Sequence, residues 1–219
     1  MWAPFVIIST VIGCYIVYFS FFGHAAFGYD TGMYRAYISL YAQAIDPPQF
    51  VFGSILGFFH RIGIPQDIVL FGGYFAAIAL FFTSIWLCAK RYLNEQAPYF
   101  FLLVSSSVIV HEWILAFYFR NLVGLACCFL LFAYRKRNIP LVVVLSILAM
   151  LIHPVTAVFA LCVLLAHTFF FSKEKSDWYW PVLGMLLGAI LIIPELSRYM
   201  DDLFAYKQKL ADGIWSDEF

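Results

Sequence analysis

Long apolar runs follow one another along most of the chain, and short polar breaks separate them. Seven such runs lie at residues 2–22, 68–88, 98–118, 121–134, 139–152, 155–171 and 178–195. A helix needs about 20 consecutive apolar residues to cross the hydrocarbon core of a bilayer, so the fourth and fifth runs are short for a span. The pattern predicts an all-α, polytopic transmembrane helical bundle of about seven spans, some of them short or broken.

The stretch 139–171 requires a break, because as one helix it would be roughly 50 Å long and would overshoot the bilayer. The break is expected at His153-Pro154. Proline removes an amide donor and clashes with the preceding turn, which leaves either a kinked crossing or a hairpin of two helices.

The positive charges distinguish these two alternatives. With a hairpin, seven of the 13 basic residues fall in short loops on one side of the membrane: Lys90, Arg91, Arg135, Lys136, Arg137, Lys173 and Lys175. The positive-inside rule makes that side cytoplasmic, which places the N-terminus in the cytoplasm and the C-terminus outside. A kinked crossing would instead put the last two lysines outside, so the charges favour the hairpin.

The outer connection between the first two runs, residues 23–67, is expected to contain two short helices. Apolar positions recur at helical spacing over 31–46, with polar residues between them, which is typical of a helix lying on the membrane surface. A second short helix is predicted over 51–62.

Composition excludes two broad classes of protein. Hydrophobic residues make up 64% of the chain, charged residues 12%, and the mean hydropathy is +0.88, which is too apolar for a soluble domain of this length. The formal net charge of zero gives no basic face for nucleic acid. We expect a single transmembrane domain over 1–219, either complete or the N-terminal part of a longer membrane protein.

Two acidic residues are candidates for catalysis. Asp30 precedes the first surface helix, where it serves as an N-cap, as a general base, or as a ligand of a divalent ion on a diphosphate. Glu112 lies inside the third apolar run, where an ionised side chain is costly unless it faces water or the bundle interior. Helical spacing puts Glu112 about two turns before Arg120 and near the same face, which predicts an ion pair or a shared cavity.

Arg120 and His153 are the candidates for contact with a phosphate. Arg120 ends the third run at the interface, and its guanidinium matches the geometry of phosphate, although snorkelling to ordinary headgroups is the alternative. His153 could protonate a leaving phosphate, bind it as a cation, or cap the turn. No dedicated zinc site is predicted, because the five cysteines form no CxxC pair and no second His lies near His153.

Three segments, in this order, resemble the EpsG-type membrane proteins of exopolysaccharide biosynthesis, which are similar in plan to Wzy-like polymerases and multispanning GT-C glycosyltransferases. The segments are 28–34 (GYDTGMY), 119–126 (FRNLVGLA) and 149–157 (AMLIHPVTA). The shared features are an outer-loop Asp followed by Tyr, an Arg opening a span, and a His before a small hydroxylated residue. The resemblance covers about residues 23–206 and implies a bacterial inner or plasma membrane.

The resemblance implies transfer or polymerisation of sugar from a polyprenyl-linked donor to a glycan acceptor at the outer leaflet. Under this hypothesis Arg120, helped by Arg35 or His153, binds the donor phosphate. Asp30 or Glu112 takes the proton of the incoming hydroxyl.

Tyr34 and Trp113 are the residues expected to stack on sugar rings. Membrane lipids and further membrane subunits are the other expected partners, and a divalent cation is the one cofactor that this chemistry could use. Two alternatives stay open. One is a proton-coupled transporter or flippase of a lipid-linked or anionic substrate, and the other is a non-catalytic subunit of a membrane complex.

Overall fold

The computed structural model describes residues 3–23, 30–42, 50–116, 118–171 and 178–193, and this part of the chain is helical with no strand. The elements are α1 (Ala3–Phe22), α2 (Asp30–Ala42), α3 (Phe50–Arg61), η2 (Ile68–Gly72), α4 (Gly73–Leu93), η3 (Asn94–Gln96), α5 (Ala97–Ser105), α6 (Val108–Leu115), α7 (Phe119–Tyr134), α8 (Ile139–Ile152), α9 (Pro154–Phe171) and the helix Tyr179–Ile193. The predicted all-α class is confirmed. Lys173, Lys175 and the end of the seventh predicted span lie outside the described residues.

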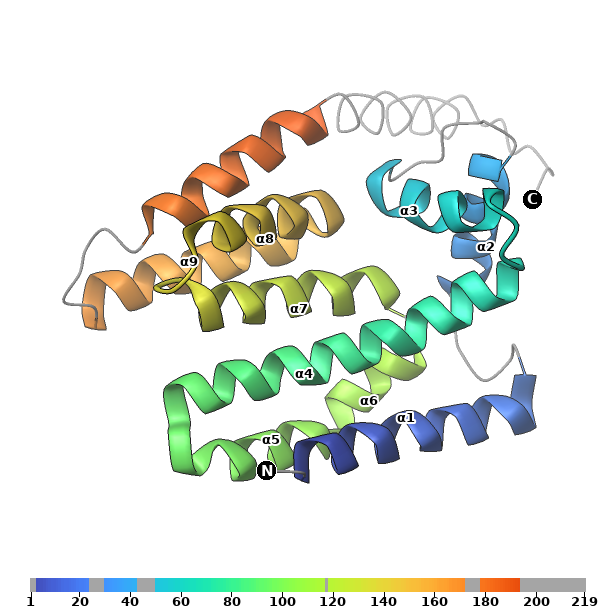
Figure 1. The fold of residues 1–219 in the computed structure, drawn as a ribbon, viewed down its shortest axis with the longest axis horizontal. Coiled ribbons are helices and arrows are strands. Elements are labelled where there is room, and N and C mark those ends of the chain that lie inside the picture. The colour runs from blue at the N-terminus through green and yellow to red at the C-terminus, as the bar shows by residue number, and fades with distance from the viewer. Residues whose placement is uncertain (1–2, 24–29, 43–49, 117, 172–177, 194–219) are drawn as a thin grey trace, which may run out of the picture.

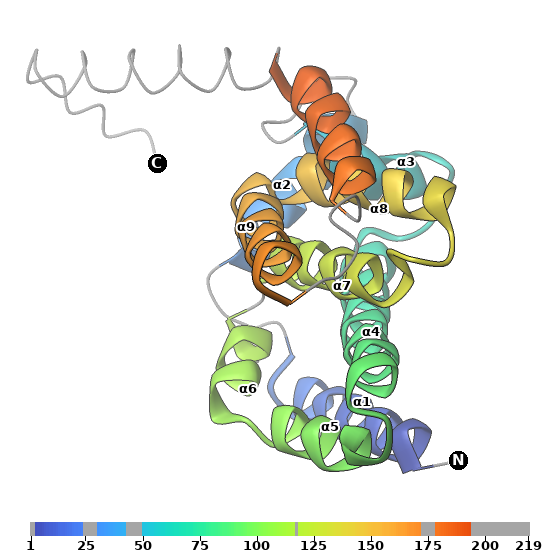
Figure 2. The same ribbon diagram turned by 90° about the vertical axis from the view of Figure 1, so that its left-hand side faces the viewer.

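The helices stack in layers around α4 (Figure 1). Helix α4 packs against α7 on one side and against α1 and α5 on the other. Helix α7 packs in turn on α8 and α9, and the helix Tyr179–Ile193 covers α8 at the far side (Figure 2). The middle of the molecule is therefore the α4–α7 pair.

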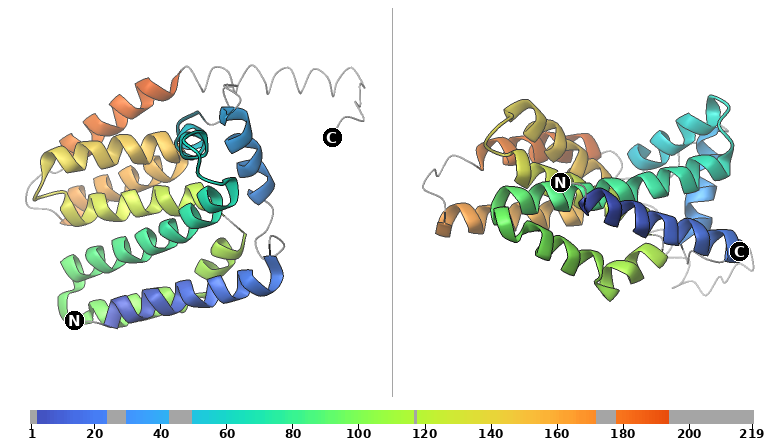
Figure 3. Two further views of the ribbon diagram at one scale, coloured as in Figure 1. Left: turned by 45° about the vertical axis from the view of Figure 1, so that its right-hand side comes forward. Right: turned by 60° about the horizontal axis from the view of Figure 1, so that its bottom comes forward.

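The two short helices expected between the first two apolar runs are confirmed as helices. Helix α2 covers 30–42 of the predicted 31–46, and α3 covers 50–61 of the predicted 51–62. They pack against each other at one end of the bundle, beside the start of α4 (Figure 3). The location of this pair on a membrane surface stays a prediction.

The predicted third span, 98–118, is wrong as a single helix. Helix α5 ends at Ser105 and α6 begins at Val108. The hydroxyls of Ser105 and Ser106 donate to carbonyls three residues earlier, at 3.1 and 3.2 Å, and such bonds compete with the backbone ladder. Ser107 then adopts an extended backbone (φ −68°, ψ 123°), which redirects the chain. Apolar composition concealed this serine-marked break.

His111 holds the redirected helix α6 in place. Its Nε2 lies 2.8 Å from the carbonyl oxygen of Ser105, so Nε2 is the donor. The other ring nitrogen, Nδ1, lies 2.6 Å from the hydroxyl of Tyr15 in α1. This side chain therefore connects α6 to both α5 and α1.

The chain doubles back at His153-Pro154, as the hairpin interpretation predicted. A Cβ on Gly124, near the start of α7, would lie 2.8 Å from the Cβ of His153. At the other end of α7, Arg135 Nη2 lies 3.3 Å from Nδ1 of His167 in α9. Helices α7 and α9 thus run side by side in the same direction. Because the short turn 135–138 reverses α8 against α7, α8 and α9 form an antiparallel hairpin (Figure 1).

Glycines allow the helix Tyr179–Ile193 to approach α8 closely. A Cβ on Gly184 would lie 2.6 Å from the Cβ of Ser146 and 2.7 Å from the carbonyl oxygen of Val143. One turn later, a Cβ on Gly188 would lie 2.8 Å from the Cβ of Met150. Small residues four apart are a common way to bring two apolar helices into backbone contact.

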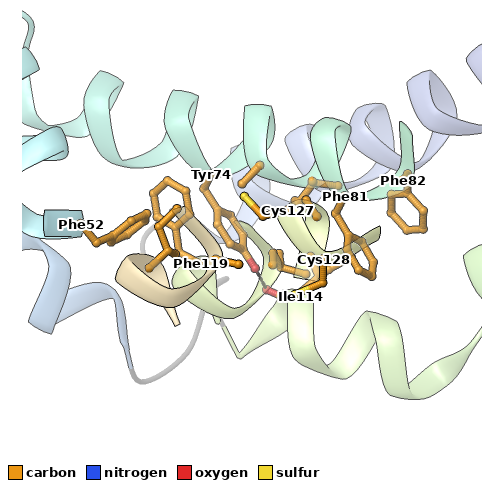
Figure 4. Close-up of a cluster of buried hydrophobic side chains, with 14 of the residues drawn as sticks. Phe52, Tyr74, Phe81, Phe82, Ile114, Phe119, Cys127 and Cys128 are labelled. Carbon is orange, nitrogen blue, oxygen red and sulfur yellow. Dashed lines mark hydrogen bonds between the residues drawn. The ribbon is translucent and has the colours of Figure 1, made fainter. Parts of the chain in front are cut away.

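Aromatic side chains fill the core between α3, α4 and α7 (Figure 4). Tyr74 of α4 is fully buried, and its hydroxyl donates a hydrogen bond to the carbonyl oxygen of Ile114 in α6. The ring of Phe119 lies edge-on to Tyr74 at 5.4 Å and to Phe52 of α3 at 4.9 Å. This cluster fixes the first turn of α7, where Arg120 lies.

Two helical stretches are long and apolar enough to cross a membrane, Pro4–Phe22 and Ile68–Ser105. The second includes the turn at Asn94, whose positive φ of 45° ends α4 and sends the chain into α5. The remaining apolar helices of the described chain, including α7 and α8, are shorter than a full crossing. The seven predicted crossings are therefore not all present as full-length helices.

Candidate functional site

Arg120 is fixed by a tertiary cap at the start of α7. It is the second residue of that helix, and its backbone N–H donates to the hydroxyl of Tyr34 at 3.2 Å. The first amides of a helix have no partner within the helix, so Tyr34 supplies the acceptor that one of them lacks. Arg120 is partly buried and forms no ion pair within the described chain.

Tyr34 is a packing residue in this arrangement. Its side chain is 2% exposed, and its ring lies 5.7 Å from the rings of both Phe52 and Phe119. Stacking of a sugar on this ring would require the packing to open. The structure therefore gives Tyr34 a second role, positioning Arg120, which spacing in the sequence does not reveal.

His153 lies in the break between α8 and α9 and caps α9. Its Nδ1 accepts a hydrogen bond from the backbone N–H of Thr156 at 3.1 Å, and the hydroxyl of Thr156 lies 2.6 Å from the same nitrogen. Because Nδ1 is an acceptor, the proton of the neutral ring is on Nε2. The capping role considered for His153 is confirmed, and it leaves Nε2–H as a donor.

Arg120 and His153 meet on one face of α7. Gly124 lies one turn after Arg120, and its missing side chain is what allows the close approach of His153. Burial lowers the pKa of His153 below its usual value of 6.5, and the positive charge of Arg120 lowers it further. His153 is therefore a neutral hydrogen-bond donor at pH 7, and binding of an anion as a resident imidazolium is disfavoured.

Arg35 is engaged by an acidic residue that the sequence analysis did not single out. Its Nη2 lies 2.6 Å from the carboxylate of Asp67, and its guanidinium lies 5.9 Å from the ring centroid of Phe71. Gln66 adds a hydrogen bond of 2.7 Å from its side-chain amide to the backbone carbonyl of Arg35. These contacts attach α2 to the start of the α4 stretch, so a role for Arg35 in substrate binding would compete with Asp67.

Glu112 does not share a helix with Arg120, and the predicted helical alignment of the two residues is wrong. Helix α6 ends at Leu115, and Tyr118 has a non-helical backbone (φ −72°, ψ 60°) before α7 begins. In the described chain no ion pair joins Glu112 to Arg120. Glu112 and its neighbour Trp113, which is 39% exposed, both lie on the outer surface of α6.

Asp30 is the first residue of α2, one turn before Tyr34. This position agrees with the helix start expected there. The contacts of its carboxylate lie outside the described part of the structure, so its candidate roles as base, cap or metal ligand stay predictions.

The structure thus brings together Arg120, His153, Thr156 and Gly124, with Tyr34 behind them. A guanidinium and an Nε2–H donor beside the first turns of α7 and α9 suit an anion, since helix N-termini also attract negative charge. The C-terminus of α8 lies at the same break and opposes this field, so the net attraction comes mainly from Arg120.

Comparisons of the chain with protein-family models, with curated proteins and with solved structures give no match. The resemblance to the EpsG-type proteins therefore stays an expectation from the three sequence segments. What the fold and the geometry define is an all-helical chain with a candidate anion site at one end.

Proposed function

We propose that the chain is an integral membrane protein that crosses the bilayer several times. Besides the two stretches that are long enough to cross, apolar side chains cover the outside of the described bundle. Examples are Phe21 of α1, Phe159 of α9 and Ile190, which are 81%, 69% and 62% exposed. Large apolar side chains exposed on several helices favour a cover of lipid or of a protein partner.

The charges support one orientation of the bundle. The end of α4 and the 135–138 turn lie at the left in Figure 1, and they carry five basic residues: Lys90, Arg91, Arg135, Lys136 and Arg137. The positive-inside rule assigns that end to the cytoplasm. Helices α2 and α3, the start of α7 and the His153 break lie at the opposite end, which is then the outer face.

We infer that this outer site binds the phosphate of a polyprenyl-linked sugar donor, as the first step of a glycosyltransferase or polysaccharide polymerase. The observation that carries the proposal is that Arg120 and the Nε2–H donor of His153 lie together at one end of the bundle. A guanidinium in this position stabilises the negative charge that develops on a departing phosphate. A phosphate attached to a lipid lies at the membrane interface, which is where the proposed orientation puts this end of the bundle.

In the proposed reaction the bond between the anomeric carbon and the phosphate oxygen breaks, and the electron pair leaves with the polyprenyl phosphate. The acceptor hydroxyl forms the new bond to carbon, and its proton passes to a carboxylate. Asp30 and Glu112 stay the candidates for this base.

A transporter would place its polar groups near the bilayer midplane with access from both sides. The position of Arg120 and His153 at helix ends supports a site that opens to one leaflet.

The test uses the full chain in lipid nanodiscs with polyprenyl phosphate as the probe. Arg120→Gln removes the charge, and one lost charge-assisted hydrogen bond corresponds to roughly tenfold to hundredfold weaker binding. Arg61→Gln is the matched control, because Arg61 is an exposed arginine at the end of α3 and the proposed orientation puts α3 at the outer face as well. Equal affinity in the Arg120→Gln variant and in the control would refute the phosphate site.

The chemical step needs its own assay. Glycan extension from a polyprenyl-linked donor should be lost in Arg120→Ala while membrane insertion stays intact. Full extension by this variant would remove Arg120 from the mechanism.

A further inference from the structure

Arg135 is a buried arginine, and two of its nitrogens have no acceptor among the residues that the structure describes. It follows the last residue of α7 and is 7% exposed. Its Nη2 donates to Nδ1 of His167 at 3.3 Å, whereas Nε and Nη1 are buried without an acceptor in the described chain. A guanidinium is always charged, and a buried charge with unpaired donors is costly. An anion at this position would relieve that cost.

Three helices enclose the guanidinium. The ring of Tyr92, at the end of α4, lies 5.6 Å from its Cζ, and His167 of α9 lies on another side. The hydroxyl of Tyr92 donates to the carbonyl oxygen of Phe132 at 2.9 Å, which holds the ring against α7. Tyr92 is 46% exposed, so Arg135 lies one side chain beneath the surface and a movement of that ring would admit an oxygen.

The surroundings favour a phosphate that belongs to a lipid. Lys90, Arg91 and Arg137 are exposed at the same end of the bundle, and no described carboxylate forms an ion pair with Arg135. Beside His167, the last turn of α9 exposes Phe169 and Phe170, each 73% accessible. A buried guanidinium among exposed basic residues, next to an exposed apolar helix end, matches an anionic headgroup with its acyl chains, and basic sites between helices on the cytoplasmic side of membranes bind such headgroups.

We propose that Arg135, held by His167 and walled by Tyr92, binds the phosphate of an anionic phospholipid headgroup in the cytoplasmic leaflet. His167 acts as a positioning residue, because its Nδ1 accepts a hydrogen bond from Nη2 of Arg135 and so orients the guanidinium. The free nitrogens Nε and Nη1 then face the phosphate oxygens. The site is separate from Arg120 and His153, and it rests on the proposed membrane location but not on the proposed sugar transfer.

The experiment measures binding of phosphatidylglycerol to the purified full chain by native mass spectrometry and by the shift in unfolding temperature. Phosphatidylcholine and inorganic phosphate are the comparison probes. Phosphatidylglycerol should bind wild type at least tenfold more tightly than phosphatidylcholine, and Arg135→Gln should remove this preference. Arg137→Gln removes the same formal charge at the same end from an exposed position, and it should keep the preference.

Three results would overturn the proposal. Equal losses in Arg135→Gln and Arg137→Gln would mean diffuse attraction to a basic surface. Inorganic phosphate that reproduces the whole stabilisation, with nothing added by phosphatidylglycerol, would assign the site to free phosphate. Absence of any preference in wild type would remove the site.

Further comparisons separate a folding defect from a loss of binding, and this site from the outer one. If Arg135→Gln does not fold, Arg135→Lys is the substitute, because it keeps the charge but loses the planar guanidinium with its paired donors. It should bind phosphatidylglycerol at least tenfold more weakly than wild type. Undiminished binding by Arg135→Lys would contradict the proposal. Arg135→Gln should keep the binding of polyprenyl phosphate that Arg120→Gln loses, so failure of the outer site and failure of this one give different results.

Discussion

Replacing Gly124 by alanine tests the geometry that joins α7 to the His153 break. The new Cβ would lie 2.8 Å from the Cβ of His153, and 3.9 Å from its Cα. Carbon atoms rest at about 3.5–4.0 Å, so the contact is short by about 1 Å. The obstructing atom is the first atom of the side chain and is attached directly to the backbone, so rotation about χ1 cannot move it away. The α8–α9 break must shift instead.

The expected cost is that of overpacking, about 1–3 kcal/mol in the free energy of unfolding. Alanine also favours a helix over glycine by up to about 1 kcal/mol, which would hide part of the effect. Gly13→Ala in α1 is the matched control, because nothing lies within 4 Å of its added Cβ and the helix gain is shared. The difference between the two variants then reports the clash alone.

For a chain of this size, each kcal/mol corresponds to about 2–4 °C in the unfolding midpoint, so Gly124→Ala should unfold about 2–12 °C below Gly13→Ala. Thermal unfolding in detergent at one fixed scan rate measures this, since membrane proteins often unfold irreversibly. Gly124→Ala should also weaken polyprenyl phosphate binding, because His153 moves relative to Arg120. An unfolding midpoint equal to that of Gly13→Ala would refute the close approach of α7 to His153.

Two more predictions follow from the same packing. The pKa of His153 is lowered in the folded protein, so the unfolded chain takes up the proton first as pH falls. The stabilisation from the neutral ring is complete above the usual pKa of 6.5 and is lost as pH drops through the folded pKa. Unfolding midpoints measured from pH 7.5 to 5 should therefore fall more steeply for wild type than for His153→Gln. Parallel curves for the two proteins would contradict the lowered pKa of His153. Gly184→Ala should push the helix Tyr179–Ile193 from Ser146 and lower the unfolding midpoint relative to Gly13→Ala by about 2–12 °C, and an unchanged midpoint would argue against this helix contact.

Local signals in the sequence were sufficient to predict most helices and the main reversal of the chain. The two short helices at 30–42 and 50–61 follow from apolar positions at helical spacing. The break at His153-Pro154 follows from the missing amide of proline, and the basic loops indicate a hairpin. Apolar periodicity is a property of neighbouring residues, so it can be read without knowing the fold.

The same reasoning failed where apolar composition concealed a break. Residues 98–118 look like one span, yet the hydroxyls of Ser105 and Ser106 take up backbone carbonyls and Ser107 turns the chain. Three consecutive serines were the available signal. Because that helix is broken, the expected alignment of Glu112 with Arg120 disappeared with it.

By itself, the sequence determined an all-helical, strongly apolar chain and its turn at His153-Pro154, and it singled out Arg120 as a candidate for contact with a phosphate. Only the tertiary structure decided which partners these residues have. Tyr34 caps Arg120 from 86 positions away, Asp67 engages Arg35, and Gly124 admits His153. The physical reason is that helix formation depends on residues within a turn or two of each other, whereas the contacts of a side chain depend on how distant helices pack.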